Sequence, residues 1–168
     1  MGDDGSDRPD RKAAERSVTV GEPLMRATYR ALQQHGYVDL SIQRIADEFD
    51  KSKSLIYYHY DDKDALLLEF LDYMRERFTA ETADGGDDDS PIDRLWALYD
   101  YVNPSEIDDE RRNFHVALYE LRTKAPHSTA YRQRFTRMDE RIRERIVAIL
   151  EDGIEAEVFR DVDPEQTA

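Results

Sequence analysis

The most chemically distinctive stretch of the chain is residues 51–63, which reads KSKSLIYYHYDDK. It begins with hydroxyls and lysines and continues with three tyrosines and a histidine in four consecutive positions. A short helix that opens at Ser52 would place free N–H groups and partial positive charge beside the lysines. Such groups suit phosphate oxygens and base edges in the major groove of DNA. A small core needs only Leu55 or Ile56 and one or two of the aromatic residues, so the others are candidates for DNA contact.

Other combinations of residues that could do chemistry are missing from the sequence. There is no nucleophile paired with a base, no ordered set of metal ligands and no phosphate-binding loop, so we expect neither an enzyme nor a bound metal or cofactor. Cysteine is absent, which excludes disulfides and thiolate metal sites and fits a reducing compartment. Without a long apolar run or a secretory signal, the sequence predicts a cytoplasmic protein with no membrane partner.

A second group of aromatic and apolar residues recurs at helical spacing in the C-terminal half of the chain. These residues could line a cavity for a small molecule, but such stripes are also typical of an ordinary helical core, and both interpretations stay open. The candidates are Trp96, Tyr99, Tyr101, Phe114, His115, Leu118, Tyr119, Phe135 and Met138.

Helices must position both groups. Apolar residues at three- and four-residue spacing predict a helix over 22–34, which Gly36 ends. Residues 1–20 are polar and charged and predict a disordered arm. Three further helices follow, whose first turns can be capped by the side-chain oxygens of Ser41, Ser52 and either Asp61 or Asp62.

The helix that Asp61 or Asp62 caps is the fourth in the chain. It is long and has a sustained apolar stripe that includes Leu66, Phe70 and Phe78. Ser90 and Pro91 predict the start of another helix, which runs to about residue 102. Further helices are expected over about 108–124 and 128–152, and no stretch has the alternation of a strand. The sequence therefore predicts an all-α chain: a three-helix head joined by a long fourth helix to an antiparallel helical body.

Charge is unevenly distributed along the chain. The formal net charge is −14, with 38 acidic and 24 basic residues. Residues 8–60 carry nine bases and seven acids, a net of +2, whereas residues 61–168 carry 15 bases and 28 acids, a net of −13. The least acidic stretch therefore contains the candidate DNA-binding residues. An acidic composition with five lysines indicates a halophilic protein, because high salt screens the repulsion between its acidic side chains. The alternative is an ordinary acidic protein.

Residues 21–70 resemble the DNA-binding domain of the TetR family of transcriptional regulators. The resemblance lies in Gly36-Tyr37, in the segment 40–46 (LSIQRIA), in 52–60 (SKSLIYYHY) and in 63–67 (KDALL). It implies a helix-turn-helix over 41–60 that binds a palindromic operator in double-stranded DNA as a homodimer. The residues that it places at DNA are Ser41, Gln43, Arg44, Ser52, Lys53, Ser54, Leu55, Tyr57, Tyr58, His59 and Lys63.

The chain also departs from the family pattern. Asp50 and Lys51 stand in the turn where the family usually has glycine and an apolar residue, and Leu55 stands where a small or hydroxylic residue is common. The two last helices of the family, which pair the subunits, should begin near Pro164. The sequence stops at Ala168, so we expect the body to lack these last helices. Either the sequence is a fragment or the dimer interface differs.

The resemblance implies a ligand-responsive repressor, in which an unknown small molecule binds the body and alters the separation of two heads. The expected divisions are a DNA-binding domain over 21–67 and a ligand-binding and dimerisation body over 68–168. The alternative is a helical module that binds a small molecule or a protein and has no DNA-binding activity.

Overall fold

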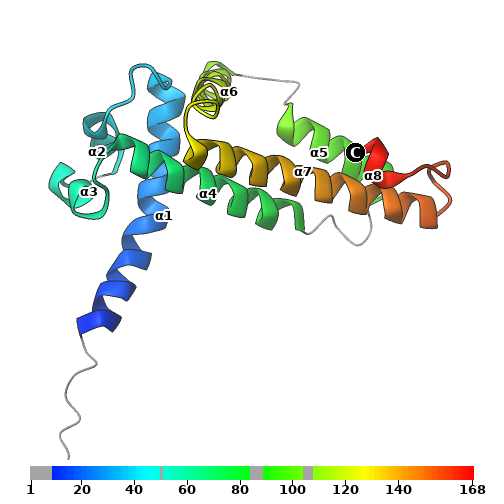
Figure 1. Ribbon diagram of the computed structural model, residues 1–168, viewed down its shortest axis with the longest axis horizontal. Helices are drawn as coiled ribbons and strands as arrows, with labels where there is room; N and C mark the ends of the chain where they lie inside the picture. Colours follow the sequence, from blue (N-terminus) through cyan, green and yellow to red (C-terminus); the bar gives the residue numbers. More distant parts are fainter. Residues whose placement is uncertain (1–8, 50, 84–88, 104–107) are drawn as a thin grey trace, which may run out of the picture.

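The computed structural model describes residues 9–49, 51–83, 89–103 and 108–168, and it describes only the backbone for 9–20, Ala83 and Glu110. In these residues the chain forms eight helices and no strand (Figure 1). The helices are α1 (Pro9–His35), α2 (Ile42–Phe49), α3 (Lys53–His59), α4 (Lys63–Ala83), α5 (Pro91–Val102), α6 (Asp109–Arg122), α7 (Thr129–Glu155) and α8 (Pro164–Thr167).

The first helix is longer than the sequence predicts. The structure corrects the expected disordered arm over residues 9–20, whose backbone is helical and continuous with the rest of α1; residues 1–8 lie outside the described part. Residues 10–16 are mostly strong helix formers, which explains the extension. Pro23 lies inside α1, where it removes one backbone hydrogen bond.

Several of the predicted helix ends are confirmed, and the side-chain cap predicted at Ser52 is wrong. Gly36 has φ +66°, in the left-handed region, and its N–H donates to Leu32 O at 2.9 Å. The Ser41 hydroxyl accepts from the N–H of Arg44, and Asp62 caps α4 through the N–H of Ala65 at 2.7 Å. Further side-chain caps come from Ser90, Asp108 and Ser128. Ser52 precedes α3 with no side-chain cap bond, and Asp50 lies outside the described residues.

The head consists of α1, α2 and α3, which pack through their apolar faces. In α2 these residues are Ile42, Ile45, Ala46 and Phe49, as predicted. They face the stripe of α1 that includes Leu24, Ala31 and Leu32, all fully buried. A head of this size has a small core, so each of these side chains accounts for a large share of its stability.

The core of the head continues into the body without a break. One buried cluster includes residues of α1, α2, α3, α4, α6 and α7, because α4 leaves the head with Leu66, Leu67 and Phe70 fully buried. Helix α6 packs against α1, and α4 lies side by side with α7 (Figure 1). Phe114 of α6 lies 4.3 Å from Tyr29 of α1, measured between ring centroids. Head and body therefore pack against each other where α6 and α4 contact α1.

A partly buried polar cluster reinforces this junction. The ammonium group of Lys124 and the hydroxyl of Tyr131 both donate to Oδ1 of Asp64, in the first turn of α4. Lys124 also lies over the ring of Tyr37, between α1 and α2, with Nζ 5.5 Å from the centroid. Burial alone would raise the pKa of Asp64, but the hydrogen bonds and positive charge of Lys124 outweigh it and hold that pKa below its usual range.

A second, smaller core lies at the far end of the body, around Phe78, Leu98 and Ile149. After α7 the chain turns back, and the N–H groups of Val158 and Phe159 both donate to Gly153 O at 2.9 Å. A Cβ at Gly153 would stand 2.0 Å from the Phe159 ring, so only glycine allows this close approach. A helix begins at Pro164, as expected, and α8 packs on α7.

Phe49→Ala should destabilise the head. Phe49 is buried between α1 and α2, and removing a large buried aromatic side chain costs about 3–5 kcal/mol. Thermal unfolding should show a clearly lower Tm than in Tyr58→Ala, a matched control in which the aromatic side chain is 82% exposed. Equal melting temperatures in the two variants would show that Phe49 does not contribute to the core.

Asp64→Asn should lower stability at neutral pH and have less effect in acid. A carboxylate whose folded pKa is depressed stabilises the fold above its unfolded pKa, and this contribution is lost as pH falls through the folded value. The difference in Tm between wild type and variant should therefore be largest near pH 7 and shrink below about pH 4. A difference that stays constant across this range would contradict the ionic role of Asp64.

Candidate DNA-binding surface and ligand cavity

Helix α3 is anchored on one side and exposed on the other. Ile56 is fully buried in the core of the head, and Leu55 is half-buried against the same cluster. The opposite side presents an exposed surface made of Ser52, Lys53, Ser54, Tyr57 and Tyr58. The structure thus exposes five of the predicted DNA contacts at or next to α3 and leaves Leu55 largely engaged in packing.

The exposed side chains of α3 form a mixed cationic and aromatic surface. Lys53 and Tyr57 stand one helical turn apart, and Nζ of Lys53 lies 5.7 Å from the Tyr57 ring centroid. Tyr57 and Tyr58 are 50% and 82% exposed, far more than a core role would allow. His59 is half-buried and meets the Tyr58 ring edge-on at 5.2 Å.

Tyr60, which follows α3, belongs to the core side. It packs against the buried cluster, and burial, followed by a hydrogen bond with Glu69, raises the pKa of its hydroxyl.

The predicted DNA contacts at the start of α2 differ in how exposed their side chains are. Ser41 is exposed even though its hydroxyl accepts the N–H of Arg44. Gln43 is exposed, and its amide donates to Asp47 Oδ1 at 2.8 Å. Arg44 is half-buried, and its guanidinium donates to Asp39 O at 2.6 Å, so it braces the loop before α2. Ser41 and Gln43 are therefore the more accessible of the three predicted contacts.

Lys63 holds the head together as well as lying near its surface. Its ammonium group donates to Leu40 O at 3.0 Å and lies 4.8 Å from the Tyr37 ring centroid. An ammonium group has three donors, so two remain for other acceptors. Phosphate contact by Lys63 stays a prediction, and this residue also ties the start of α4 to the loop before α2.

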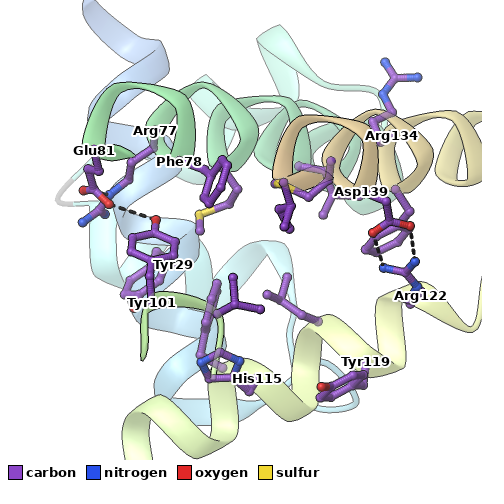
Figure 2. A pocket seen from close by; sticks show the side chains of 18 of the residues that line it. Tyr29, Arg77, Phe78, Glu81, Tyr101, His115, Tyr119, Arg122, Arg134 and Asp139 are labelled. Carbon is purple, nitrogen blue, oxygen red and sulfur yellow. Dashed lines mark hydrogen bonds and ion pairs between the residues drawn. The ribbon is translucent and has the colours of Figure 1, made fainter. Parts of the chain in front are cut away.

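The body contains a cavity of about 330 Å³ between α4, α6 and α7 (Figure 2). Tyr29 of α1 and Tyr101 of α5 also line it. Its apolar walls come from residues such as Leu71, Met74 and Ile142. A largely apolar cavity with a few polar groups is the usual form of a small-molecule site.

Ion pairs stand at two places in the cavity wall. Arg77 and Glu81 of α4 pair at 2.6 Å, and the Tyr101 hydroxyl donates to Glu81 at 2.9 Å. Burial, followed by this hydrogen bond, raises the pKa of Tyr101. At the other place Arg122 of α6 binds both carboxylate oxygens of Asp139 of α7 (Figure 2).

Most of the predicted cavity residues line it, and two do not. Those that do are Phe114, His115, Leu118, Tyr119, Phe135, Met138 and also Tyr101. Trp96 and Tyr99 are a correction: they lie on the outer face of α5, 65% and 57% exposed, and contact each other edge-on. Their helical spacing matched that of the buried stripe, but α5 turns Leu98 toward the core instead.

Sequence reasoning missed the contributions of α1 and α4 to the cavity. Tyr29 stands beside a stripe assigned to the head, and Arg77 with Glu81 has the four-residue spacing of an ordinary surface ion pair. Arg122 and Asp139 are 17 residues apart, so their pairing is visible only in three dimensions. A weak signal did exist, since Leu71, Met74 and Phe78 continue the apolar stripe of α4.

Among the residues that the structure describes, no cluster of three or more metal-ligating side chains occurs. None of the described helices is both long enough and apolar enough to cross a membrane.

Two family models match this chain. Residues 24–70 match the model of bacterial regulatory proteins of the tetR family, and residues 91–168 match the C-terminal model of BetI-type transcriptional repressors. Among curated proteins, the HTH-type transcriptional regulator BetI of Stenotrophomonas maltophilia is 31% identical over 96 residues. That match covers 55% of this chain and 46% of the relative, which is less than half of the relative's length.

Solved structures extend the match to most of the chain. A TetR transcription regulator from Haloarcula marismortui is 45% identical, with a TM-score of 0.72 over 89% of this chain and 78% of that one. A putative transcriptional regulator from Saccharomonospora viridis, solved in complex with choline, has the same fold at 22% identity, with a TM-score of 0.72 over 89% and 78% of the two chains. With a matched head, a matched body and close similarity to a solved member, the chain belongs to the TetR family of transcriptional regulators.

Proposed function

We propose that this chain is a ligand-responsive repressor that binds a palindromic operator in double-stranded DNA through α2 and α3. The observation that carries the proposal is the exposed face of α3, where Lys53, Tyr57 and Tyr58 project away from the core. A core-facing role does not explain two tyrosines that are at least half exposed. In a major groove their hydroxyls and the ammonium group of Lys53 would reach phosphates and base edges.

Within this proposal the predicted residues divide by role. Those that lead into the groove are Ser52, Lys53, Ser54, Tyr57 and Tyr58, with Ser41 and Gln43 beside them on α2. The half-buried residues Arg44, Leu55, His59 and Lys63 position this surface and contact DNA with the part of each side chain that stays accessible. In protein–DNA complexes, contacts with the DNA phosphates set the register of the protein on the duplex, and contacts with base edges set the sequence specificity.

The proposed protein acts as a homodimer. A palindromic operator presents two half-sites about 34 Å apart, and two recognition helices must match that spacing. The cavity borders α4, which leaves the head directly, and Tyr29 of α1 lines it. A ligand that displaces either helix changes the separation of the two heads, and a small tilt is enough to prevent both from binding at once.

The choline complex of the neighbour from Saccharomonospora viridis supports ligand binding by bodies of this fold. The alternative, a helical module without DNA-binding activity, gains some support from the charge of the body, which is net −13 over residues 61–168. Selection of duplexes from a random library tests the two directly. Enrichment of a palindromic sequence supports the repressor, and failure to enrich any sequence favours the module.

We also propose that the protein is halophilic and cytoplasmic. An acidic composition poor in lysine supports the halophilic part, and a similar regulator comes from Haloarcula marismortui. The lack of cysteine supports the cytoplasmic part. The physical reason is that an acidic surface repels itself and its neighbours unless salt screens it.

Lys53→Ala should weaken DNA binding while the fold is kept, because Lys53 is exposed and makes no ion pair among the described side chains. Losing one phosphate contact should reduce the slope of log affinity against log salt by about one unit or less. Fluorescence anisotropy with the selected duplex measures both affinity and slope.

Arg143→Ala is the matched control for Lys53→Ala, since Arg143 lies on α7 and pairs with Glu165 of α8, far from the head. It removes the same charge and should leave the slope unchanged. If both variants bind DNA like the wild type, the exposed face of α3 is not the DNA-binding surface.

The thermal stability of the protein should rise with salt. The Debye length falls from about 10 Å at 0.1 M to about 3 Å at 1 M, which relieves repulsion across the acidic body. We expect Tm to increase from about 0.1 to about 3 M potassium chloride, a range chosen around that 1 M reference. DNA binding should persist near 1 M with a shallow slope, since residues 8–60 carry a net charge of only +2. A flat or falling Tm would reject the halophilic adaptation and leave the DNA-binding proposal intact.

A further inference from the structure

Four arginines line the cavity. The charge of the ligand that it accepts depends on which of these arginines are neutralised by a carboxylate. Three are paired with carboxylates: Arg77 with Glu81, Arg122 with Asp139 and Arg134 with Asp72. The fourth, Arg111, has no ion-pair partner among the side chains that the structure describes. The described lining therefore has an excess of positive charge at Arg111, within a body whose residues 61–168 are net −13.

Arg111 has a polar neighbour on the same face of α6. His115 follows it by four residues, which places the two side chains one turn apart, and both line the cavity. Burial, followed by the charge of Arg111, lowers the pKa of His115, so its imidazole is neutral at pH 7. A neutral imidazole keeps one N–H donor. Together the two residues offer donors to one anionic group at the exposed edge of the cavity.

The aromatic walls of the cavity do not suit a cationic ligand. The guanidinium of Arg77 lies 5.9 Å from the Tyr29 ring centroid, and that of Arg122 lies 5.2 Å from the Phe135 centroid. These are the positions that a ligand cation would take in a cation–π contact. At Tyr29 and Phe135 a quaternary ammonium group would have to displace an arginine from the ring, and Arg111 would repel it.

The rest of the cavity is suited to an apolar group. Apart from Arg111, His115, the paired charged residues and the tyrosines, the remaining walls are apolar and consist largely of Leu71, Met74, Phe78, Leu118, Met138 and Ile142. The volume, about 330 Å³, lies at the low end of the range of about 300–1,000 Å³ for small-molecule pockets. It therefore fits a compact ligand or a short chain.

We propose that the effector is a small amphipathic organic anion, whose carboxylate binds Arg111 and His115 and whose apolar part lies between α4, α6 and α7. This rests on the proposed function, because it names the ligand class of the same cavity. The acidic surface of the body repels anions in general. Binding of an anion must therefore come from this local arrangement of side chains.

Three probes of equal chain length and different charge test the proposal: octanoate, octan-1-ol and octylammonium. Isothermal titration calorimetry with the full chain should give the tightest binding for octanoate, about tenfold tighter than octan-1-ol, the size of one charge-assisted hydrogen bond. Octylammonium should bind most weakly. Equal affinities, a preference for octylammonium or binding of none of the three would overturn the proposal.

Arg111→Gln should remove the preference for octanoate over octan-1-ol and leave the binding of octan-1-ol within about twofold. Arg112→Gln is the matched control, because Arg112 is adjacent, exposed and paired with Asp109 and does not line the cavity. It removes the same charge and should keep the preference. Equal loss in both variants would mean that general surface charge attracts octanoate, and retention in both would exclude Arg111 as its partner.

A DNA measurement separates this inference from the proposed function. If octanoate binds through Arg111 and releases the selected duplex, both are supported. If it binds through Arg111 but leaves DNA affinity unchanged, the anion site stands and its regulatory role fails. If a palindromic duplex is enriched but the cavity does not prefer octanoate over octan-1-ol, the proposed function stands and the anion site fails. Melting curves for both variants confirm that each is folded at the salt used.

Discussion

The packing of Phe114 against α1 and α4 is the contact on which the rest of the structure depends. Its ring centroid lies 4.3 Å from that of Tyr29 and 6.3 Å from that of Phe70. Phe114 and Tyr29 are also cavity residues, whereas Phe70 is fully buried in the core shared with the head. A ligand in the cavity therefore touches the side chains that hold α1 and α4 in place. Because cores are closely packed, a shift there moves the head as a unit rather than being absorbed locally.

The five lysines of this acidic chain are not evenly distributed over the structure. Lys51 and Lys53 are exposed just before α3 and at its first residue, on the proposed DNA-binding surface. Lys63 and Lys124 instead lie over the Tyr37 ring at the junction of head and body, each with a hydrogen bond to the protein. The arginines mostly form ion pairs in the body. Lysine is thus concentrated in the head and at its junction, where a compact charge with several donors is useful.

The fold was largely predictable because it depends on local signals. Apolar residues at helical spacing located α2, α4, α6 and α7, and the caps at Ser41, Asp62 and Ser90 set helix ends to within a residue. The extension of α1 was missed because residues 1–20 are polar and charged and lack the apolar stripe by which the other helices were recognised. Exposure on α3 was predictable from composition, since a small core cannot hold so many polar aromatic side chains.

The cavity was only half predictable, for a different reason. Apolar stripes identify which face of a helix is buried, but they do not show where packing leaves a space or which helices enclose it. Trp96 has the spacing of a core residue and is exposed, while Tyr29 belongs to α1 and lines the cavity. Long-range pairs such as Arg122 with Asp139 are set by the crossing of α6 and α7. No spacing within either helix encodes that crossing.

The acidic surface and the charged residues at the cavity respond differently to salt. Exposed acidic side chains repel one another over distances that salt screens, so their effect disappears at high ionic strength. The charges at the cavity act over hydrogen-bond distances, which are no longer than the Debye length even at 1 M salt. An anion site at Arg111 and His115 therefore keeps its selectivity under conditions that neutralise the acidic surface. A strongly acidic exterior and an anion-binding interior are compatible because they act over different ranges.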